Sequence, residues 1–178
     1  MNVVVYCGSS FGANPRFREA ARVLGEWIGL SGNQLVYGGS SVGLMGVVSR
    51  AALDAGAEVD GVEPQFFIDA GVEQHDLTNL FVVQTMAERK TKMIELGDVF
   101  VALPGGVGTL EEISEIASRV RLGLGQDACY LLNVDGFYEP LKAQLALMEQ
   151  EGFLSPEDAG RYRFVSSVEE LVGMITSS

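Results

Sequence analysis

Residues 99–120 combine a buried strand, a glycine-rich turn and a helix, and this combination constrains the fold more than any other stretch. Val99 to Leu103 form an uninterrupted apolar run, as fully buried strands do. The turn that follows reads LPGGVGTLEE, and the apolar residues of 113–120 recur at helical spacing. A short apolar strand that leads through glycines into a helix is typical of α/β proteins with a parallel sheet.

Strands and helices are predicted to alternate along the whole chain. Apolar runs predict strands at 3–6, 34–37, 58–63, 80–83, 99–103, 129–134 and near 164–165. Helical spacing predicts helices at 15–31, 47–55, 65–69, 86–96, 109–120, 137–151 and 168–175. We therefore expect one Rossmann-like, doubly wound α/β domain over residues 1–178. Its mainly parallel sheet would have about six or seven strands, with helices on both faces.

Composition narrows the classes of partner. The chain has 178 residues, is 47% hydrophobic and carries a formal net charge of −12. Such a charge disfavours binding to nucleic acid or to an anionic membrane surface. The start, MNVVVYCGSS, lacks the basic segment of a secretory signal, and no apolar run reaches membrane-spanning length. We expect a cytoplasmic protein in which Cys7 and Cys129 are buried free thiols.

The turn at 104–112 has the features of a phosphate site. Gly105, Gly106 and Gly108 leave room for a ligand, and the N–H groups of a helix start attract anions. Glu111 and Glu112 are expected in the first helical turn, where the helix dipole favours carboxylates. A carboxylate beside a phosphate is nevertheless costly, which suggests that one of the two has a chemical role while the other faces solvent.

A second glycine-rich loop, YGGSSVGLMG, follows the strand at 34–37. It lacks the acidic partner of a dinucleotide fingerprint and the Lys-Ser/Thr of a Walker loop. Its glycines can serve packing alone, but ligands of doubly wound folds bind at the carboxyl ends of the strands, where both loops and the 7–10 loop would lie. From these loops the expected substrate contacts are Ser9, Gly38, Gly39, Ser40, Gly43 and Met45.

Arg89 and Lys90 follow the fourth predicted strand and would lie at the same edge of the sheet. A charge cluster of this kind is often a solvated helix face. In so acidic a chain, however, an arginine at this edge suits a phosphate or a sugar oxygen. His75, the only histidine, falls in the irregular stretch 64–78 and has no predicted role. We find no Ser-His-Asp arrangement and no metal-ligand spacing, so neither a metal nor another cofactor is expected.

YGGSSVGLMG, TMAERK and LPGGVGTLEE, in this order and at these separations, resemble the LONELY GUY (LOG) family of cytokinin-activating phosphoribohydrolases. The similarity extends from VYCGSS to LLNVDGFY and QEGF. The family is often labelled lysine decarboxylase, but no lysine here is placed to hold pyridoxal phosphate.

The resemblance implies hydrolysis of the N-glycosidic bond of N6-modified adenosine 5′-monophosphates, which releases the free base and ribose 5-phosphate. It assigns catalysis to Arg89 and Glu112. It also implies a homodimer with the active site near the subunit interface. The substrate contacts that it implies are Lys90, Gly106, Val107, Gly108, Thr109, Leu110, Glu111 and Ser118.

Several positions depart from the family pattern. Ser40 stands where a third glycine is usual, and Asp60 and Glu63 replace apolar residues of the third strand. Arg119, Gly125 and Ala128 replace a commoner tryptophan, histidine and proline. The physiological base therefore stays open between prenylated and plain adenine. Two other readings also stay open: a nucleotide or cofactor carrier of the same fold, and an acidic protein-interaction module.

Overall fold

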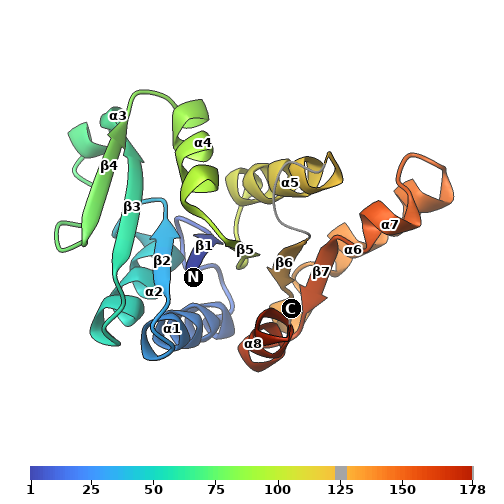
Figure 1. The fold of residues 1–178 in the computed structure, drawn as a ribbon, viewed down its shortest axis with the longest axis horizontal. Helices are drawn as coiled ribbons and strands as arrows, with labels where there is room; N and C mark the ends of the chain where they lie inside the picture. The colour runs from blue at the N-terminus through green and yellow to red at the C-terminus, as the bar shows by residue number, and fades with distance from the viewer. Residues whose placement is uncertain (123–127, 178) are drawn as a thin grey trace.

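The computed structural model describes residues 1–122 and 128–177. Within them, seven strands form one parallel sheet in the order β4-β3-β2-β1-β5-β6-β7 (Figure 1). The strands are β1 (Asn2–Tyr6), β2 (Gln34–Tyr37), β3 (Val59–Pro64), β4 (Asn79–Val83), β5 (Val99–Ala102), β6 (Cys129–Leu132) and β7 (Tyr162–Val165). This confirms the predicted doubly wound α/β fold.

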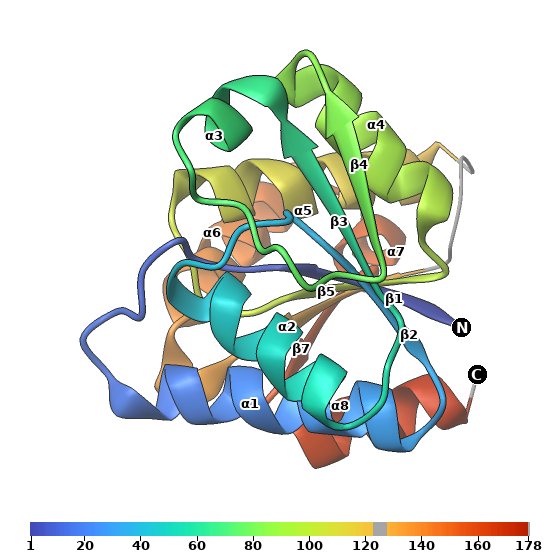
Figure 2. The same ribbon diagram turned by 90° about the vertical axis from the view of Figure 1, so that its left-hand side faces the viewer.

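Helices cover both faces of the sheet. The helices are α1 (Pro15–Leu30), α2 (Gly43–Asp54), α3 (Gln65–Asp69), α4 (Met86–Leu96), α5 (Val107–Arg121), α6 (Glu139–Gln150), α7 (Pro156–Ala159) and α8 (Val168–Thr176). Figure 2 shows α1, α2 and α8 on one face and α4 and α5 on the other. A separate cluster of buried apolar side chains fills each face. The site helices α4 and α5 therefore share one layer.

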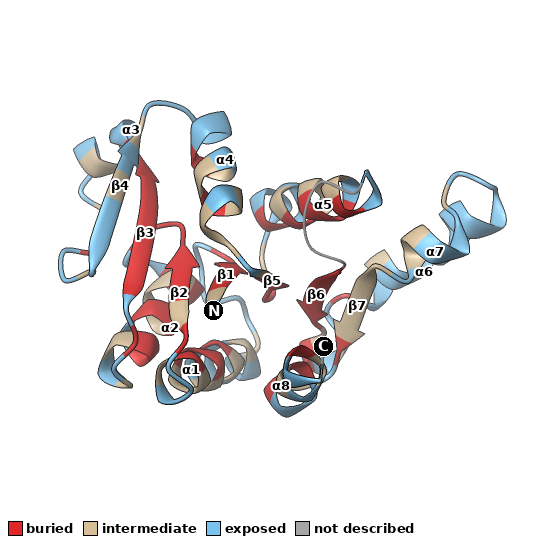
Figure 3. Cartoon of the chain, viewed as in Figure 1, coloured by how far each residue is buried: buried red, intermediate tan, exposed pale blue. Residues whose placement is uncertain are grey.

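The inner strands are hydrophobic along their full length because both of their faces are covered. Val3, Val4, Leu35 and Val36 are wholly buried, whereas β4 is an exposed edge strand (Figure 3). Asp60 and Glu63 are acidic residues that strands disfavour, yet both lie buried in β3. The expectation of two buried free thiols is also met, since Cys7 and Cys129 are both buried and unpaired.

Three predicted boundaries were wrong. Helix α2 begins at Gly43 rather than Val47, because the Leu44 N–H donates to the Gly8 carbonyl and starts the helix despite its glycines. Strand β6 ends at Leu132 because Asp135 takes a positive φ of 50°, and 134–136 form a 3₁₀ turn. Helix α6 consequently begins at Glu139 rather than at residue 137.

Two smaller features were also mispredicted. Helix α7, whose start is capped by the Ser155 hydroxyl, was not predicted. Helix α5 begins at Val107, two residues earlier than expected. Glu111 and Glu112 therefore lie in its second turn, where the stabilisation by the helix dipole is already weaker.

Candidate active site

The 7–10 loop and the two glycine-rich loops follow β1, β2 and β5, the strands at which the order of the sheet changes direction. Strand β1 pairs with β2 on one side and with β5 on the other. The strands β2 to β4 therefore extend the sheet on one side of β1, and β5 to β7 extend it on the other. The Gly8 N–H donates to the Pro104 carbonyl at 3.1 Å, and the Leu44 N–H donates to the Gly8 carbonyl at 3.0 Å. The ends of β1, β2 and β5 are thus joined at the crevice where doubly wound folds bind ligands.

The loop after β5 leaves the N-terminus of α5 open. No side chain within the described residues caps this end, and a Cβ added at Gly106 or Gly108 would meet no atom within 4 Å. The first N–H groups of a helix have no partner within the helix, so those of 107–109 can receive an anion. The Tyr138 hydroxyl, which donates to the Leu103 carbonyl at 2.6 Å, fixes the base of the loop.

Thr109 is the buried residue of this turn. Its side chain packs against Gly105, where the absence of a Cβ makes room for it. Its main-chain N–H belongs to the open end of α5 and can donate to a ligand. Val107 and Leu110, by contrast, are exposed on either side of Thr109.

Side chains of the protein itself pack closely against the glycine-rich loop that follows β2. A Cβ on Gly38 would collide with the Arg89 guanidinium, and a Cβ on Gly39 would lie 2.6 Å from a carboxylate oxygen of Glu63. These two glycines therefore make room for side chains of the chain, which gives them a packing role. Gly43 packs equally closely, against the main chain of Ser9, while Met45 lies half-buried beside Gly38.

Ser40 is buried in the loop after β2. It is 3% exposed, and its hydroxyl donates to the Val72 carbonyl at 3.0 Å. An isolated bridge also pairs Ser40 with Glu73. The Ser40 side chain thus anchors the irregular 70–78 segment. Ser9, in the neighbouring loop, is exposed.

Arg89 comes from the first turn of α4 and is 8% exposed. Its Nε donates to the Val62 carbonyl and its Nη2 to the Gly38 carbonyl, both at 3.0 Å. These two bonds hold the guanidinium at the ends of β2 and β3. A guanidinium has five N–H donors, and Nη1 has only the weak acceptor Met86 Sδ at 3.9 Å, so donors remain for a ligand.

The two glutamates of the motif have different environments. Glu111 is exposed and accepts a hydrogen bond from Lys90 Nζ at 2.8 Å, and Glu115 receives the same ammonium at 3.0 Å. Glu112 is partly buried, and this burial raises its pKa to about 7 against the opposing charge of Arg89. Within the described residues no ion pair within 4.0 Å joins Glu112 to Arg89, although the charge of Arg89 acts to lower the pKa of Glu112.

Other predicted residues lie farther away or outside the described part of the chain. Ser118 is exposed on α5, and a helical rise of about 1.5 Å per residue places it about 14 Å from Thr109. His75 is 84% exposed and lies 3.8 Å from Glu73. Gly125 lies outside the described residues.

Two side chains near the site were not predicted from sequence. Tyr6, at the end of β1, is buried, and burial together with the charge of Glu112 raises the pKa of its phenol. Glu63 is also buried, and burial raises its pKa to about 7, against the opposing charge of Arg89. The sequence signals for Glu63 were its acidic character in a predicted strand and its departure from the family pattern at that position.

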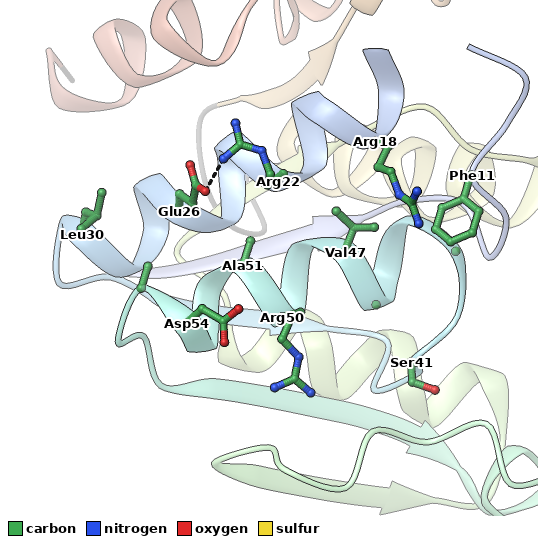
Figure 4. Close-up of a pocket in the computed structure, with 13 residues that line it drawn as sticks. Phe11, Arg18, Arg22, Glu26, Leu30, Ser41, Val47, Arg50, Ala51 and Asp54 are labelled. Atoms are coloured by element: carbon green, nitrogen blue, oxygen red, sulfur yellow. Dashed lines mark hydrogen bonds and ion pairs between the residues drawn. The ribbon is translucent and has the colours of Figure 1, made fainter. Parts of the chain in front are cut away.

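A separate pocket of about 610 Å³ opens between α1 and α2 (Figure 4). Its lining includes Arg22 and Glu26, which form an ion pair, and Arg18, which lies 4.2 Å from the centre of the Phe11 ring. Neither Arg89 nor Glu112 belongs to its lining, and its two helices cover the opposite face of the sheet from α4 and α5. This pocket is distinct from the candidate active site.

The described residues contain neither a metal-binding cluster nor a membrane-spanning helix. Across 1–122 and 128–177, no group of three or more His, Cys, Asp or Glu side chains could hold a metal ion. Within the same residues, no helix has the length and apolarity needed to cross a membrane.

Solved structures share the fold at low sequence identity. A molybdenum cofactor binding protein of Rippkaea orientalis superposes with a TM-score of 0.76 at 24% identity, over 99% of this chain and 95% of that one. The molybdenum cofactor carrier protein of Chlamydomonas reinhardtii gives 0.72 at 20% identity, over 99% and 96%. At such identities the likeness shows the fold alone.

Sequence comparisons identify the family. The family model described as "Possible lysine decarboxylase" matches residues 45–175. The cytokinin riboside 5′-monophosphate phosphoribohydrolase of Rhodococcoides fascians is 41% identical over 177 residues, which cover 99% of this chain and 89% of that protein. The LOG enzyme of the same name from Oryza sativa subsp. japonica is 43% identical over 159 residues, which cover 89% of this chain and 65% of that protein. The chain belongs to the LOG family.

Proposed function

We propose that this protein hydrolyses the N-glycosidic bond of adenosine 5′-monophosphates, including N6-modified ones, and releases the free base and ribose 5-phosphate. One observation carries the proposal above all others: Glu112, an unpaired carboxyl with a raised pKa, lies in the helix whose N-terminus is open to an anion. The names of relatives at about 40% identity support the same reaction.

The 5′-phosphate would bind at the N-terminus of α5. The main-chain N–H groups of 107–109 point out of the helix end, and the bare Cα atoms of Gly106 and Gly108 let an anion approach closely. Glu112 follows Val107 by five residues, so it lies about 7 Å along the helix axis. A phosphate at the helix end would therefore place its attached ribose beside the carboxyl.

The chemistry then follows from charge. Cleavage of an N-glycosidic bond develops positive charge on the anomeric carbon, and an ionised Glu112 would stabilise that charge. With a pKa of about 7, the same carboxylate can also take a proton from the attacking water near neutral pH. The free N–H groups of Arg89 would donate to the ribose or to the departing base, which assists departure of the base.

The lysines of the chain do not support lysine decarboxylation through a pyridoxal phosphate Schiff base. Lys90 bridges Glu111 and Glu115, and this pairing raises its pKa, which keeps the amine protonated. Lys92 faces Glu95 at 3.7 Å, and Lys142 is exposed on α6. A Schiff base needs a neutral amine in a cofactor site, which none of these three residues offers.

The proposal includes a homodimer whose interface lies beside the active site. Exposed apolar side chains support it: Val107 is 88% exposed and Leu122 is 68% exposed, at opposite ends of α5. Leu110, in the first turn of α5, and Met86, at the start of α4, are also exposed. Apolar patches of this kind are typical of association surfaces. Light scattering after size exclusion would give twice the monomer mass of 19.1 kDa if the proposal is right.

A product assay tests the reaction. The protein would be incubated with AMP and with isopentenyladenosine monophosphate, and the products would be separated by chromatography. Free base and ribose 5-phosphate in equal amounts are expected from at least one of the two nucleotides. Thermal stabilisation by nucleotide without release of base would instead indicate a carrier.

A further inference from the structure

Glu63 is a buried carboxyl without a recorded partner. It lies at the end of β3, is 1% exposed, and its Oε2 has no hydrogen-bond partner among the described residues. Asp60, on the same strand, is also buried, but it accepts a hydrogen bond from Asn79 at 2.8 Å. An unsatisfied buried carboxyl is costly to a fold, so its presence at this position needs an explanation.

Arg89 and Glu63 pack against consecutive glycines of the loop that follows β2. The absence of a Cβ at Gly38 admits the guanidinium, and the absence of a Cβ at Gly39 admits the carboxyl. Residue Val62, directly before Glu63, accepts the hydrogen bond from Arg89 Nε. Two consecutive glycines therefore accommodate one positive and one ionisable group at the edge of the candidate site.

The positive charge of Arg89 acts on two carboxyls, those of Glu63 and Glu112. This charge lowers the pKa of Glu63 and that of Glu112, against the burial that raises both. Neither carboxyl forms an ion pair within 4.0 Å of it among the described residues. Glu73, in the segment after α3, is the other charged group that acts on Glu63, and its effect raises the pKa of Glu63 further.

We propose that Glu63 is a positioning residue that sets how much of the positive charge of Arg89 is available to Glu112 and to the substrate. This inference rests on the proposed hydrolysis. An ionised Glu63 offsets part of the field of the guanidinium, whereas a neutral Glu63 leaves that field whole. The residue acts through Arg89 and does not contact the reacting atoms.

The expected effect of a neutral residue at position 63 is a lower pKa of Glu112. Glu63→Gln is neutral at every pH, so the full charge of Arg89 would act on Glu112 and lower its pKa. If catalysis requires ionised Glu112, the acidic limb of kcat/KM moves to lower pH, by about half a unit or more. Glu63→Ile, equally neutral but without hydrogen-bonding atoms, should move the limb in the same direction. A purely structural role would leave the midpoint in place while lowering the rate.

Asp60→Asn is the matched control. It also converts a buried carboxyl of β3 to an amide, but Asp60 lies three positions, about 10 Å, along the strand from Glu63. Its acidic limb should coincide with that of the wild type. Glu63→Asp, which keeps an ionisable group, should restore a midpoint closer to the wild type than that of Glu63→Gln.

The experiment measures kcat/KM against pH for the wild type and these variants, with base release from AMP or isopentenyladenosine monophosphate as the readout. A common shift of Glu63→Gln and Glu63→Ile to lower pH, absent in Asp60→Asn, supports the inference. Wild-type hydrolysis with unshifted limbs in both neutral variants overturns the inference alone. Absence of hydrolysis by the wild type overturns the proposed function, and this inference with it.

A binding measurement tests the role of Glu63 without relying on hydrolysis. In a Glu112→Gln background, AMP affinity measured by calorimetry should still change near pH 7 because Glu63 titrates. The additional change Glu63→Gln should remove that component, and the titration of the AMP phosphate is the same in both proteins. Identical pH dependences in the two proteins would contradict a role for Glu63 in setting the charge at Arg89.

Discussion

Arg89 donates a hydrogen bond from Nη2 to the carbonyl oxygen of Gly38 at 3.0 Å, so the main chain at the end of β2 fixes this guanidinium. Together with the bond from Nε to Val62, it explains why Gly38 is a glycine: any side chain there would occupy the space of the guanidinium. The glycine-rich loop after β2 thus holds the Arg89 guanidinium in place.

Replacement of Arg89 by lysine should therefore be strongly harmful. A lysine has no planar fork with which to bond both carbonyls, so the charge would no longer be held in place. We expect kcat/KM to fall by about 100-fold or more, with the larger effect on kcat. Steady-state kinetics would measure the change, with Arg50→Lys as a control, since Arg50 forms an exposed ion pair with Asp76. Equal activity of the two variants would exclude a catalytic Arg89.

Two glycine-to-alanine variants should separate packing from ligand binding. Gly39 has a φ of 83° and a carboxylate oxygen in the way of a Cβ, so Gly39→Ala should destabilise the fold by about 1 kcal/mol or more. Gly106 has open space around it, so Gly106→Ala should fold normally but weaken nucleotide binding by crowding the anion. Thermal melts with and without AMP would show both effects. Unchanged nucleotide stabilisation in Gly106→Ala would argue against a phosphate at this helix end.

Stability should depend on pH through Glu63. Its pKa rises from an ordinary value near 4.5 to about 7 on folding, so the native state binds the proton more tightly. The associated stability is complete below about pH 4.5 and is lost as pH rises through 7. Glu63→Gln should thus gain stability over the wild type at pH 8, by up to about 3 kcal/mol, and lose this advantage near pH 4.5. Urea titrations at both pH values would measure this difference, and a constant difference would contradict the assignment.

Activity should also depend on pH through Glu112. Its pKa of about 7 implies that the carboxyl is largely protonated at pH 6 and largely ionised at pH 8. If the ionised form is required, kcat/KM should fall about tenfold for each unit below pH 6. A pH profile of wild-type base release would reveal this limb, and an activity that is flat from pH 5 to 8 would exclude Glu112 as the group that must ionise.

The sequence predicted most of the fold because the local patterns agreed with the tertiary arrangement. Runs such as Val3–Tyr6 are apolar on both faces, which is the signature of an inner parallel strand, and the alternation with helices specified the doubly wound sheet. The predictions were wrong where long-range contacts decide. Helix α2 begins four residues before the predicted boundary. Its start depends on a hydrogen bond to the distant Gly8 carbonyl, which no local sequence signal marks.

For the candidate site, the motif spacing predicted that Arg89, Glu112 and the start of α5 lie at one edge of the sheet. It could not show which glycines are packed against side chains of the protein itself. The packing of Thr109 against Gly105 and of Glu63 against Gly39 depends on where side chains of other elements meet the loops. The burial of Ser40 has the same origin, since its partner Val72 lies in an irregular segment.

The central claim is that Glu112 is the catalytic carboxylate and that the substrate phosphate binds at the nearby N-terminus of α5. The most direct measurement is the rate of base release from a nucleoside 5′-monophosphate by the wild type, Glu112→Gln and Glu111→Gln, side by side at pH 7.5. Glu111 is exposed and paired with Lys90, so it provides a matched control in the neighbouring position. We predict a loss of about 100- to 10,000-fold in Glu112→Gln, an unchanged melting temperature, and nearly normal turnover in Glu111→Gln. Nearly normal turnover in Glu112→Gln, or no base release by the wild type, would contradict this account.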